Sequence, residues 1–97
     1  KVNFDAVNAA AISALPALLR RWLPDGCQMG VEWVAKNPTR HDRRAGSFKI
    51  NTKNGKWADF ATGDTGGDVV SLAAYLSGCG QAEAARKLAE MLGVSCD

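Results

Sequence analysis

Apolar residues recur at steps of three and four along the first part of the chain, and they are Phe4, Val7, Ala11, Leu15, Leu18 and Trp22. This spacing places them on one face of a helix, so we predict helical structure over this stretch. Because Pro16 lacks an amide hydrogen and its ring clashes with the preceding turn, we expect the stretch to divide there into two helices, with Ser13 as a cap. A Pro-Asp-Gly turn signal over residues 23–26 ends the helical region.

The middle of the chain shows the alternation of apolar and polar positions that is typical of β-strands. We predict strands over Met29–Ala35, Ser47–Asn51 and Lys56–Phe60. The pair Asn54-Gly55 is a hairpin signal, because both residues tolerate positive φ. The second and third strands should therefore form an antiparallel hairpin.

Alternation along these strands separates their side chains into two faces. Trp57 and Asp59 share one face of the third strand, and Ala58 and Phe60 share the other. Periodicity alone does not tell which of the two faces meets the core. For Trp57 both core packing and exposure stay open, whereas we expect Trp33 and Phe48 to lie in the core.

The last third of the chain predicts two helices after a glycine-rich connector at residues 62–67. Asp68 is expected to cap a helix that runs to about Ser77 and stops at Gly78. A further helix should run from about Gln81 to Leu92 and stop at Gly93. The fold class is then α+β, in which a small antiparallel sheet of about three strands packs with N-terminal helices and two antiparallel C-terminal helices that cover it, all in one domain over residues 1–97.

The 97 residues are 46% hydrophobic and 23% charged, as in ordinary globular domains. No apolar run approaches the ~18 residues of a membrane span and no secretory leader is visible, so we expect a soluble, cytoplasmic protein. The net charge of +2 hides an asymmetry, because residues 36–56 hold seven basic residues against Asp42 alone, which gives +6, and the remainder is −4. A block of this kind is often only a solvated face. The interleaved Phe48 and Trp57 favour a nucleic-acid surface instead.

The three cysteines are an odd number and form no Cys-x-x-Cys pair, which argues against a disulfide framework. Together with His41, the residues Cys27, Cys79 and Cys96 would make a Cys3His set for zinc. Their wide spacing disfavours such a site, because structural zinc sites usually take their ligands in tight pairs. We expect idle or buried thiols.

Catalytic groups are few in this sequence. It has one histidine, no nucleophile elbow and no phosphate-binding loop, because Trp57 follows Gly55-Lys56 where a Ser or Thr is needed. The carboxylates of Asp59, Asp64 and Asp68 would suit a magnesium ion, although turn and capping roles explain Asp64 and Asp68 equally well. We expect a non-catalytic domain without a cofactor.

A frame of about forty residues, from Asn37 to Leu76, resembles the zinc-binding domain that opens bacterial and phage DNA primases. In that family Cys-Pro-x-His is followed by a polar loop, Ser-Phe, a strand, an aromatic strand leading into Cys-x-x-Cys-Gly, a glycine-rich turn and an apolar helix. The corresponding segments here are residues 37–40 (NPTR), 46–50 (GSFKI), 57–63 (WADFATG) and 66–72 (GGDVVSL). The loop before Ser47 is one residue longer than in the family.

All four zinc-ligand positions of that frame carry other residues, namely Asn37, Arg40, Asp59 and Thr62. Arginine has no acceptor atom and the thiolates and imidazole are absent, so the resemblance implies a metal-free version of this zinc-ribbon-like fold. We expect an ion pair between Arg40 and Asp59 to replace the metal, with Asn37 and Thr62 hydrogen-bonding nearby.

The resemblance implies a domain that binds single-stranded template DNA in a primase-like replication protein of a phage, plasmid or mobile element, either as its N-terminal part or as an accessory to it. The implied partners are single-stranded DNA and a primase catalytic domain, a helicase or a polymerase. Candidate phosphate-binding residues are Arg40, Arg43, Arg44, Lys49, Lys53 and Lys56, and the candidate stacking residue is Trp57. The alternative is a module that docks onto a replication protein through the apolar helices around Tyr75 and Leu76, without touching nucleic acid.

Overall fold

A computed structural model describes residues 1–40 and 45–97 of the chain. Within these residues it has three helices and five strands, in the order α1 (Phe4–Trp22), β1 (Cys27–Met29), β2 (Glu32–Ala35), β3 (Phe48–Asn51), β4 (Trp57–Asp59), β5 (Thr65–Gly66), α2 (Val69–Ser77) and α3 (Gln81–Leu92). The strands form one antiparallel sheet in the order in which they occur along the chain. The fold is α+β, as predicted, with more strands than the three expected.

Helix α1 runs unbroken through Pro16, so the predicted division into two helices is wrong. Asn3 caps its start, because the Asn3 side chain accepts a hydrogen bond of 3.0 Å from the Ala6 amide. The Pro16 ring is exposed, and buried residues lie on the opposite side both before and after it, as Val7 and Leu19 show. Burial along one continuous face offsets the ~3 kcal/mol that an internal proline costs a helix.

The segment predicted as one strand over Met29–Ala35 is two strands joined by a tight turn. Register pairs Met29 with Glu32, which leaves Gly30 and Val31 as the two loop residues. Gly30 has a φ of 62°, and a glycine at the first of two loop positions is what a type II′ hairpin requires. The apolar alternation continued through the turn and concealed it.

The predicted hairpin between β3 and β4 is confirmed, with a different turn. Its connection spans residues 52–56, and within it only Gly55 has positive φ, at 78°. A Cβ atom on Gly55 would come within 2.8 Å of Val69 Cγ2 in α2 and 3.2 Å of Ile12 Cδ1 in α1. The hairpin turn is therefore packed against two helices at a point where only glycine fits.

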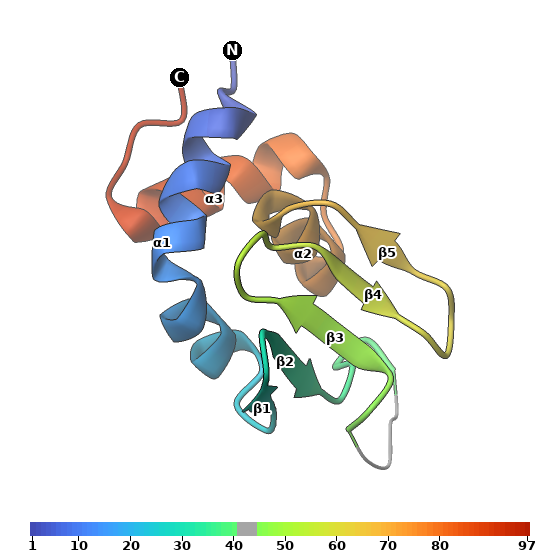
Figure 1. The fold of residues 1–97 in the computed structure, drawn as a ribbon. Coiled ribbons are helices and arrows are strands. Elements are labelled where there is room, and N and C mark those ends of the chain that lie inside the picture. Colours follow the sequence, from blue (N-terminus) through green and yellow to red (C-terminus); the bar gives the residue numbers. More distant parts are fainter. Residues whose placement is uncertain (41–44) are drawn as a thin grey trace.

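The caps of the two C-terminal helices are as predicted. Asp68 accepts a hydrogen bond of 2.8 Å from the Ser71 amide at the start of α2, and Gly78 and Gly93 adopt left-handed conformations at the ends of α2 and α3. The glycine-rich connector contains β5, which pairs with β4. Figure 1 shows α2 behind the sheet and α3 beside α1.

The inner side of the sheet forms the core together with the helices. The inner row Trp33, Ile50 and Trp57 is buried, and the row beside it contains Ala35, Phe48 and Asp59. The core positions expected for Trp33 and Phe48 are thus confirmed. No helix in the described part of the chain has the length and apolar character needed to cross a membrane.

Candidate nucleic-acid interface

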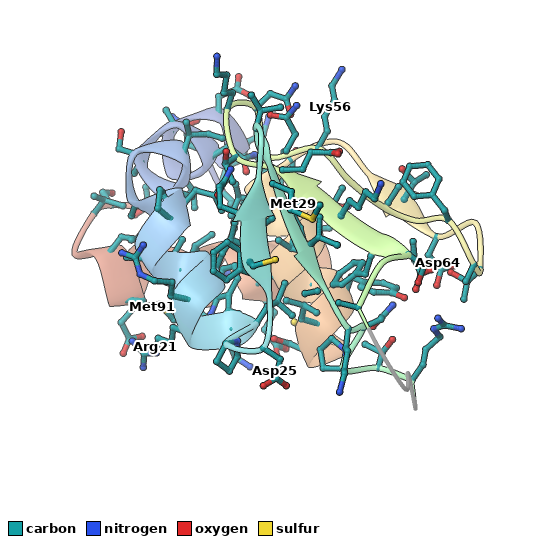
Figure 2. All side chains as sticks on the ribbon, turned by 60° about the horizontal axis from the view of Figure 1, so that its bottom comes forward. Arg21, Asp25, Met29, Lys56, Asp64 and Met91 are labelled. Atoms are coloured by element: carbon teal, nitrogen blue, oxygen red, sulfur yellow. The ribbon has the colours of Figure 1, made fainter. Side chains whose placement is uncertain are left out.

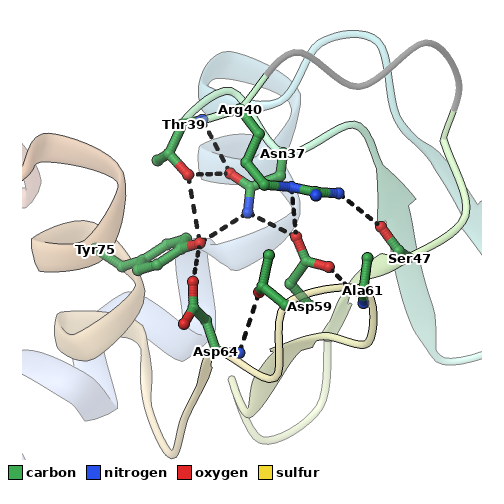
Figure 3. Close-up of polar contacts among 9 residues, drawn as sticks. Asn37, Thr39, Arg40, Ser47, Asp59, Ala61, Asp64 and Tyr75 are labelled. Atoms are coloured by element: carbon green, nitrogen blue, oxygen red, sulfur yellow. Dashed lines mark hydrogen bonds and ion pairs between the residues drawn. The ribbon is translucent and has the colours of Figure 1, made fainter.

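A polar cluster joins the loop before β3 to the end of β4 (Figure 3). At its centre the Asp59 carboxylate is fully buried and lies 3.3 Å from Arg40 Nε. The Asn37 side-chain amide, also buried, donates hydrogen bonds of 2.8 Å to Asp59 Oδ2 and to the Tyr75 hydroxyl. The hydroxyl of Tyr75 in turn donates to Asp64 Oδ2 at 2.8 Å. The expected ion pair of Arg40 with Asp59 is confirmed.

Two turns of the same construction face each other across this cluster. In the first, Asn37 Oδ1 accepts from the Thr39 amide at 2.9 Å, and Arg40 N donates to Asn37 O at 3.1 Å. In the second, Asp59 Oδ1 accepts from the Ala61 amide at 2.9 Å, and Thr62 N donates to Asp59 O at 3.3 Å. Each turn thus begins with a polar side chain that is held by its own backbone, and these two side chains bond to each other across the cluster.

Thr62 takes a different part from the one expected. Its hydroxyl accepts a hydrogen bond of 3.2 Å from the Asp64 amide, within its own turn, and its backbone alone bonds to Asp59. The cluster is completed by Thr39 and Ser47, whose hydroxyls lie near Tyr75 and Arg40 respectively. Tyr75 was not among the residues predicted to join the two turns.

The Asp59 carboxyl is held in its charged form. Burial by itself would raise the pKa of Asp59, but hydrogen bonds from Asn37 and the Ala61 amide, together with the Arg40 charge, outweigh it and bring the pKa below 3.8. A buried carboxylate with these donors has its acceptor sites used within the protein. Hydrogen bonds and the ion pair of Asp59 with Arg40 therefore link the two turns.

The carboxylates considered for magnesium have separate tasks. Asp59 pairs with Arg40, Asp64 accepts from Tyr75, and Asp68 caps α2. Among the described residues, no group of three or more His, Cys, Asp or Glu side chains is placed to hold a metal ion. The three cysteines are free thiols, with Cys27 exposed on β1, and His41 lies outside the described residues.

Trp57, the predicted stacking residue, lies in the core. Its side chain is 4% exposed, its ring centroid is 4.5 Å from that of Tyr75, and Phe48 packs edge-on against it with centroids 6.1 Å apart. A base cannot stack on a ring whose faces are covered by other aromatic side chains. The assignment of Trp57 as a stacking residue is therefore wrong in this structure.

The aromatic side chain that does face solvent is Phe60, directly after β4. It is 71% exposed, and Lys49 Nζ lies 5.7 Å from the centre of its ring. Phe60 shares the face of Ala58, opposite to Trp57, so the alternation along β4 that buries one aromatic exposes the other. The alternation along β4 already placed Phe60 and Trp57 on opposite faces. It did not show which of these faces lies in the core.

A shallow hollow of about 260 Å³ lies on the outer side of the sheet, which we call the outer hollow. Its lining includes Glu32, Lys49, Asn51, Lys56, Phe60 and Thr65. In Figure 2 Lys56 projects away from the body of the protein at the hairpin, and Met29 lies in front of the neighbouring strands. Strand register explains the grouping, since Lys49 lies opposite Ala58 and Ala58 opposite Thr65.

The predicted phosphate-binding residues are therefore divided. Lys49 and Lys56 come together with Phe60 in the outer hollow, and Lys53 is exposed on the connection between β3 and β4. Arg40 belongs to the polar cluster, with a side chain 33% exposed and its charge opposed by Asp59. Arg43 and Arg44 lie outside the described residues.

The surface expected for the docking alternative is largely covered. Leu76 is partly buried against the core, and the Tyr75 ring packs on Trp57 while its hydroxyl bonds within the polar cluster. The large apolar side chains exposed in the described residues are instead Phe4, Met29, Val31, Phe60, Met91 and Val94.

No family model matches the chain. No curated protein and no solved structure matches it significantly.

Proposed function

We propose that this domain binds single-stranded nucleic acid through the outer hollow. The observation that carries the proposal is Phe60, a ring exposed by 71% beside the cation of Lys49. An unpaired base has a π-face that stacks on such a ring, whereas bases in a duplex are already stacked on each other. The hollow therefore favours single strands over duplexes.

Cations next to the ring supply the second part of such a site. Lys49 and Lys56 line the outer hollow, and Lys53 extends the positive charge along the hairpin. Phosphates on either side of a stacked base would meet these ammonium groups and release counterions. Binding through them should weaken as salt rises.

The resemblance to primase zinc-binding domains extends the proposal to template DNA in a primase-like replication protein of a phage, plasmid or mobile element. It is supported by the two facing turns, because Asn37 to Arg40 and Asp59 to Thr62 each have the Cys-x-x-Cys or Cys-x-x-His spacing of a zinc knuckle. In this proposal the polar cluster takes the place of the metal. The domain holds the strand, and a primase, helicase or polymerase partner supplies the chemistry.

Fluorescence anisotropy with a labelled thymine oligonucleotide tests the proposal. We expect weak binding that falls steeply with salt, and Phe60→Ala should weaken it about 5- to 150-fold, since a stacked base contributes ~1–3 kcal/mol. Phe4→Ala is the matched control, because Phe4 is exposed by 37% at the start of α1 and lines a different hollow. A duplex of the same length should bind less well.

Charge reversal separates phosphate binding from general electrostatic attraction. Lys49→Glu with Lys56→Glu should abolish binding at moderate salt, whereas Arg86→Glu with Lys87→Glu on α3 should have a small effect. If no oligonucleotide binds at low salt, or if both pairs of reversals act equally, the proposal is wrong.

A further inference from the structure

Glu32 places a negative charge in the outer hollow, which is proposed to bind phosphates. Its carboxylate lines the outer hollow, whose other charged side chains are the cations Lys49 and Lys56. No ion pair of Glu32 within 4.0 Å occurs among the described residues, so neither of these lysines neutralises it directly in this structure. A carboxylate repels phosphate, and phosphate binding therefore gives no reason for a glutamate at this position.

Asn51 lies directly opposite Glu32 in the register of β2 and β3. The Asn51 side-chain oxygen already accepts hydrogen bonds from the amides of Lys53 at 2.8 Å and Asn54 at 3.2 Å. These two bonds fix the orientation of the amide, so its NH2 group is the part that can meet a ligand. The hollow thus holds a donor, Asn51, next to an acceptor, Glu32.

We infer that this pair reads the Watson–Crick edge of a guanine in the bound single strand, an inference that rests on the proposed function. Guanine places an acceptor, O6, next to two adjacent donors, N1–H and N2–H. Asn51 would donate to O6 while Glu32 accepts from both N–H groups. Adenine and cytosine have one amino group on this edge and thymine has one imino group, so only guanine gives a carboxylate two neighbouring donors.

The spacing of the pair suits one base. Side chains of directly opposite residues in an antiparallel sheet have Cβ atoms about 4.5–5.5 Å apart, so both reach one base edge. Phe60 lines the same hollow as Glu32 and Asn51. A strand with one base stacked on Phe60 would therefore present a neighbouring base to the Glu32–Asn51 pair.

The test compares thymine oligonucleotides that carry a single central guanine, inosine, adenine or thymine, all at the same salt concentration. One guanine in a thymine host avoids four-stranded guanine structures. We expect the guanine oligonucleotide to bind about 10-fold more tightly than the thymine one, the size of one good bidentate base contact. Inosine lacks the N2 amino group and should lose most of this preference.

Glu32→Gln provides the decisive variant, because it removes the second acceptor oxygen and the charge from a half-buried position on β2. It should abolish the preference for guanine while thymine oligonucleotides bind as well as before or better. Glu83→Gln on α3 is the matched control and should keep the preference. Circular dichroism confirms that each variant is folded.

The outcomes separate this inference from the proposed function. Salt-sensitive binding that needs Phe60 but shows no preference for guanine would overturn the reading of guanine and leave single-strand binding intact. A preference for guanine that survives Glu32→Gln would also overturn it, since some other group would then read the base. Absence of binding to every oligonucleotide would overturn both.

Discussion

Trp57 and Phe60 lie three positions apart, at the start and just beyond the end of the same strand, and they meet opposite environments. Trp57 is 4% exposed and packs between Phe48 and Tyr75, whereas Phe60 is 71% exposed beside Lys49. One faces the helices and the other faces solvent because successive side chains of a strand alternate. An aromatic residue in a basic segment is therefore a binding candidate only after its face of the sheet is known.

The cations of the same segment divide in a similar way. Arg40 is drawn into the polar cluster by the buried carboxylate of Asp59, and Lys49 stands on the outer face over the ring of Phe60. A positive block in the sequence thus contains both a structural ion pair and a surface patch. The inner and outer sides of the sheet should respond differently to substitution.

The largest difference is expected between the two aromatic residues. Trp57→Ala should lower the free energy of unfolding by about 3–5 kcal/mol, because it leaves a cavity between Phe48 and Tyr75. Phe60→Ala should change it by less than about 0.5 kcal/mol, since an exposed side chain loses few contacts. Urea unfolding followed by circular dichroism measures both.

If Trp57→Ala does not fold, Trp57→Phe gives the same comparison with a smaller cavity. Equal losses of stability at the two positions would mean that Phe60 is also packed in solution, and the contrast between the two sides of the sheet would be lost.

The second comparison lies within the polar cluster. Asp59→Ala should cost about 2–4 kcal/mol, because it removes the partner of the Arg40 charge and one acceptor of the buried Asn37 amide. Asp64→Ala should cost about 1 kcal/mol, since the Tyr75 hydroxyl keeps its contacts with Asn37 and Thr39. Thermal unfolding should show a clearly lower Tm for Asp59→Ala, and equal decreases would contradict the role given to Asp59.

The smallest expected effect is a loss of protein stability at acidic pH. The pKa of Asp59 is below 3.8 in the folded protein, so its contribution to stability is present above the unfolded value and is lost as the pH falls through the folded value. The stability of the wild-type protein should therefore decrease below about pH 3.8 more than that of Asp59→Asn. Unfolding measured from pH 6 to pH 2 tests this, and parallel curves for the two proteins would exclude it.

Much of the fold was predictable because local signals are strong in this chain. Asp68, Gly78 and Gly93 mark helix ends through caps that need no tertiary information, and Asn54-Gly55 marks a hairpin. Tertiary packing decided the rest. Pro16 signals a break, but a continuous buried face carries α1 through it, and the sequence could not show how well that face would be covered.

The candidate site was predictable only in part. The pairing of Arg40 with Asp59 was expected from the resemblance, in whose frame both residues occupy zinc-ligand positions, whereas the participation of Tyr75 depends on how α2 packs against the sheet. The choice between Trp57 and Phe60 required one fact that alternation lacks, namely which side the helices cover. Glu32 was missed because its opposition to Asn51 depends on the register between β2 and β3, two strands that no short turn joins.

The contact of Gly55 with Val69 and Ile12 has a mechanical consequence for the hairpin that carries Lys53 and Lys56. The turn of a β-hairpin is normally mobile, and ordering it on ligand binding costs conformational entropy. Here the turn is seated on two helices before any ligand is present, so that loss is incurred during folding. Replacing Gly55 by a larger residue would displace the turn from the two helices and leave the ammonium groups of Lys53 and Lys56 less ordered.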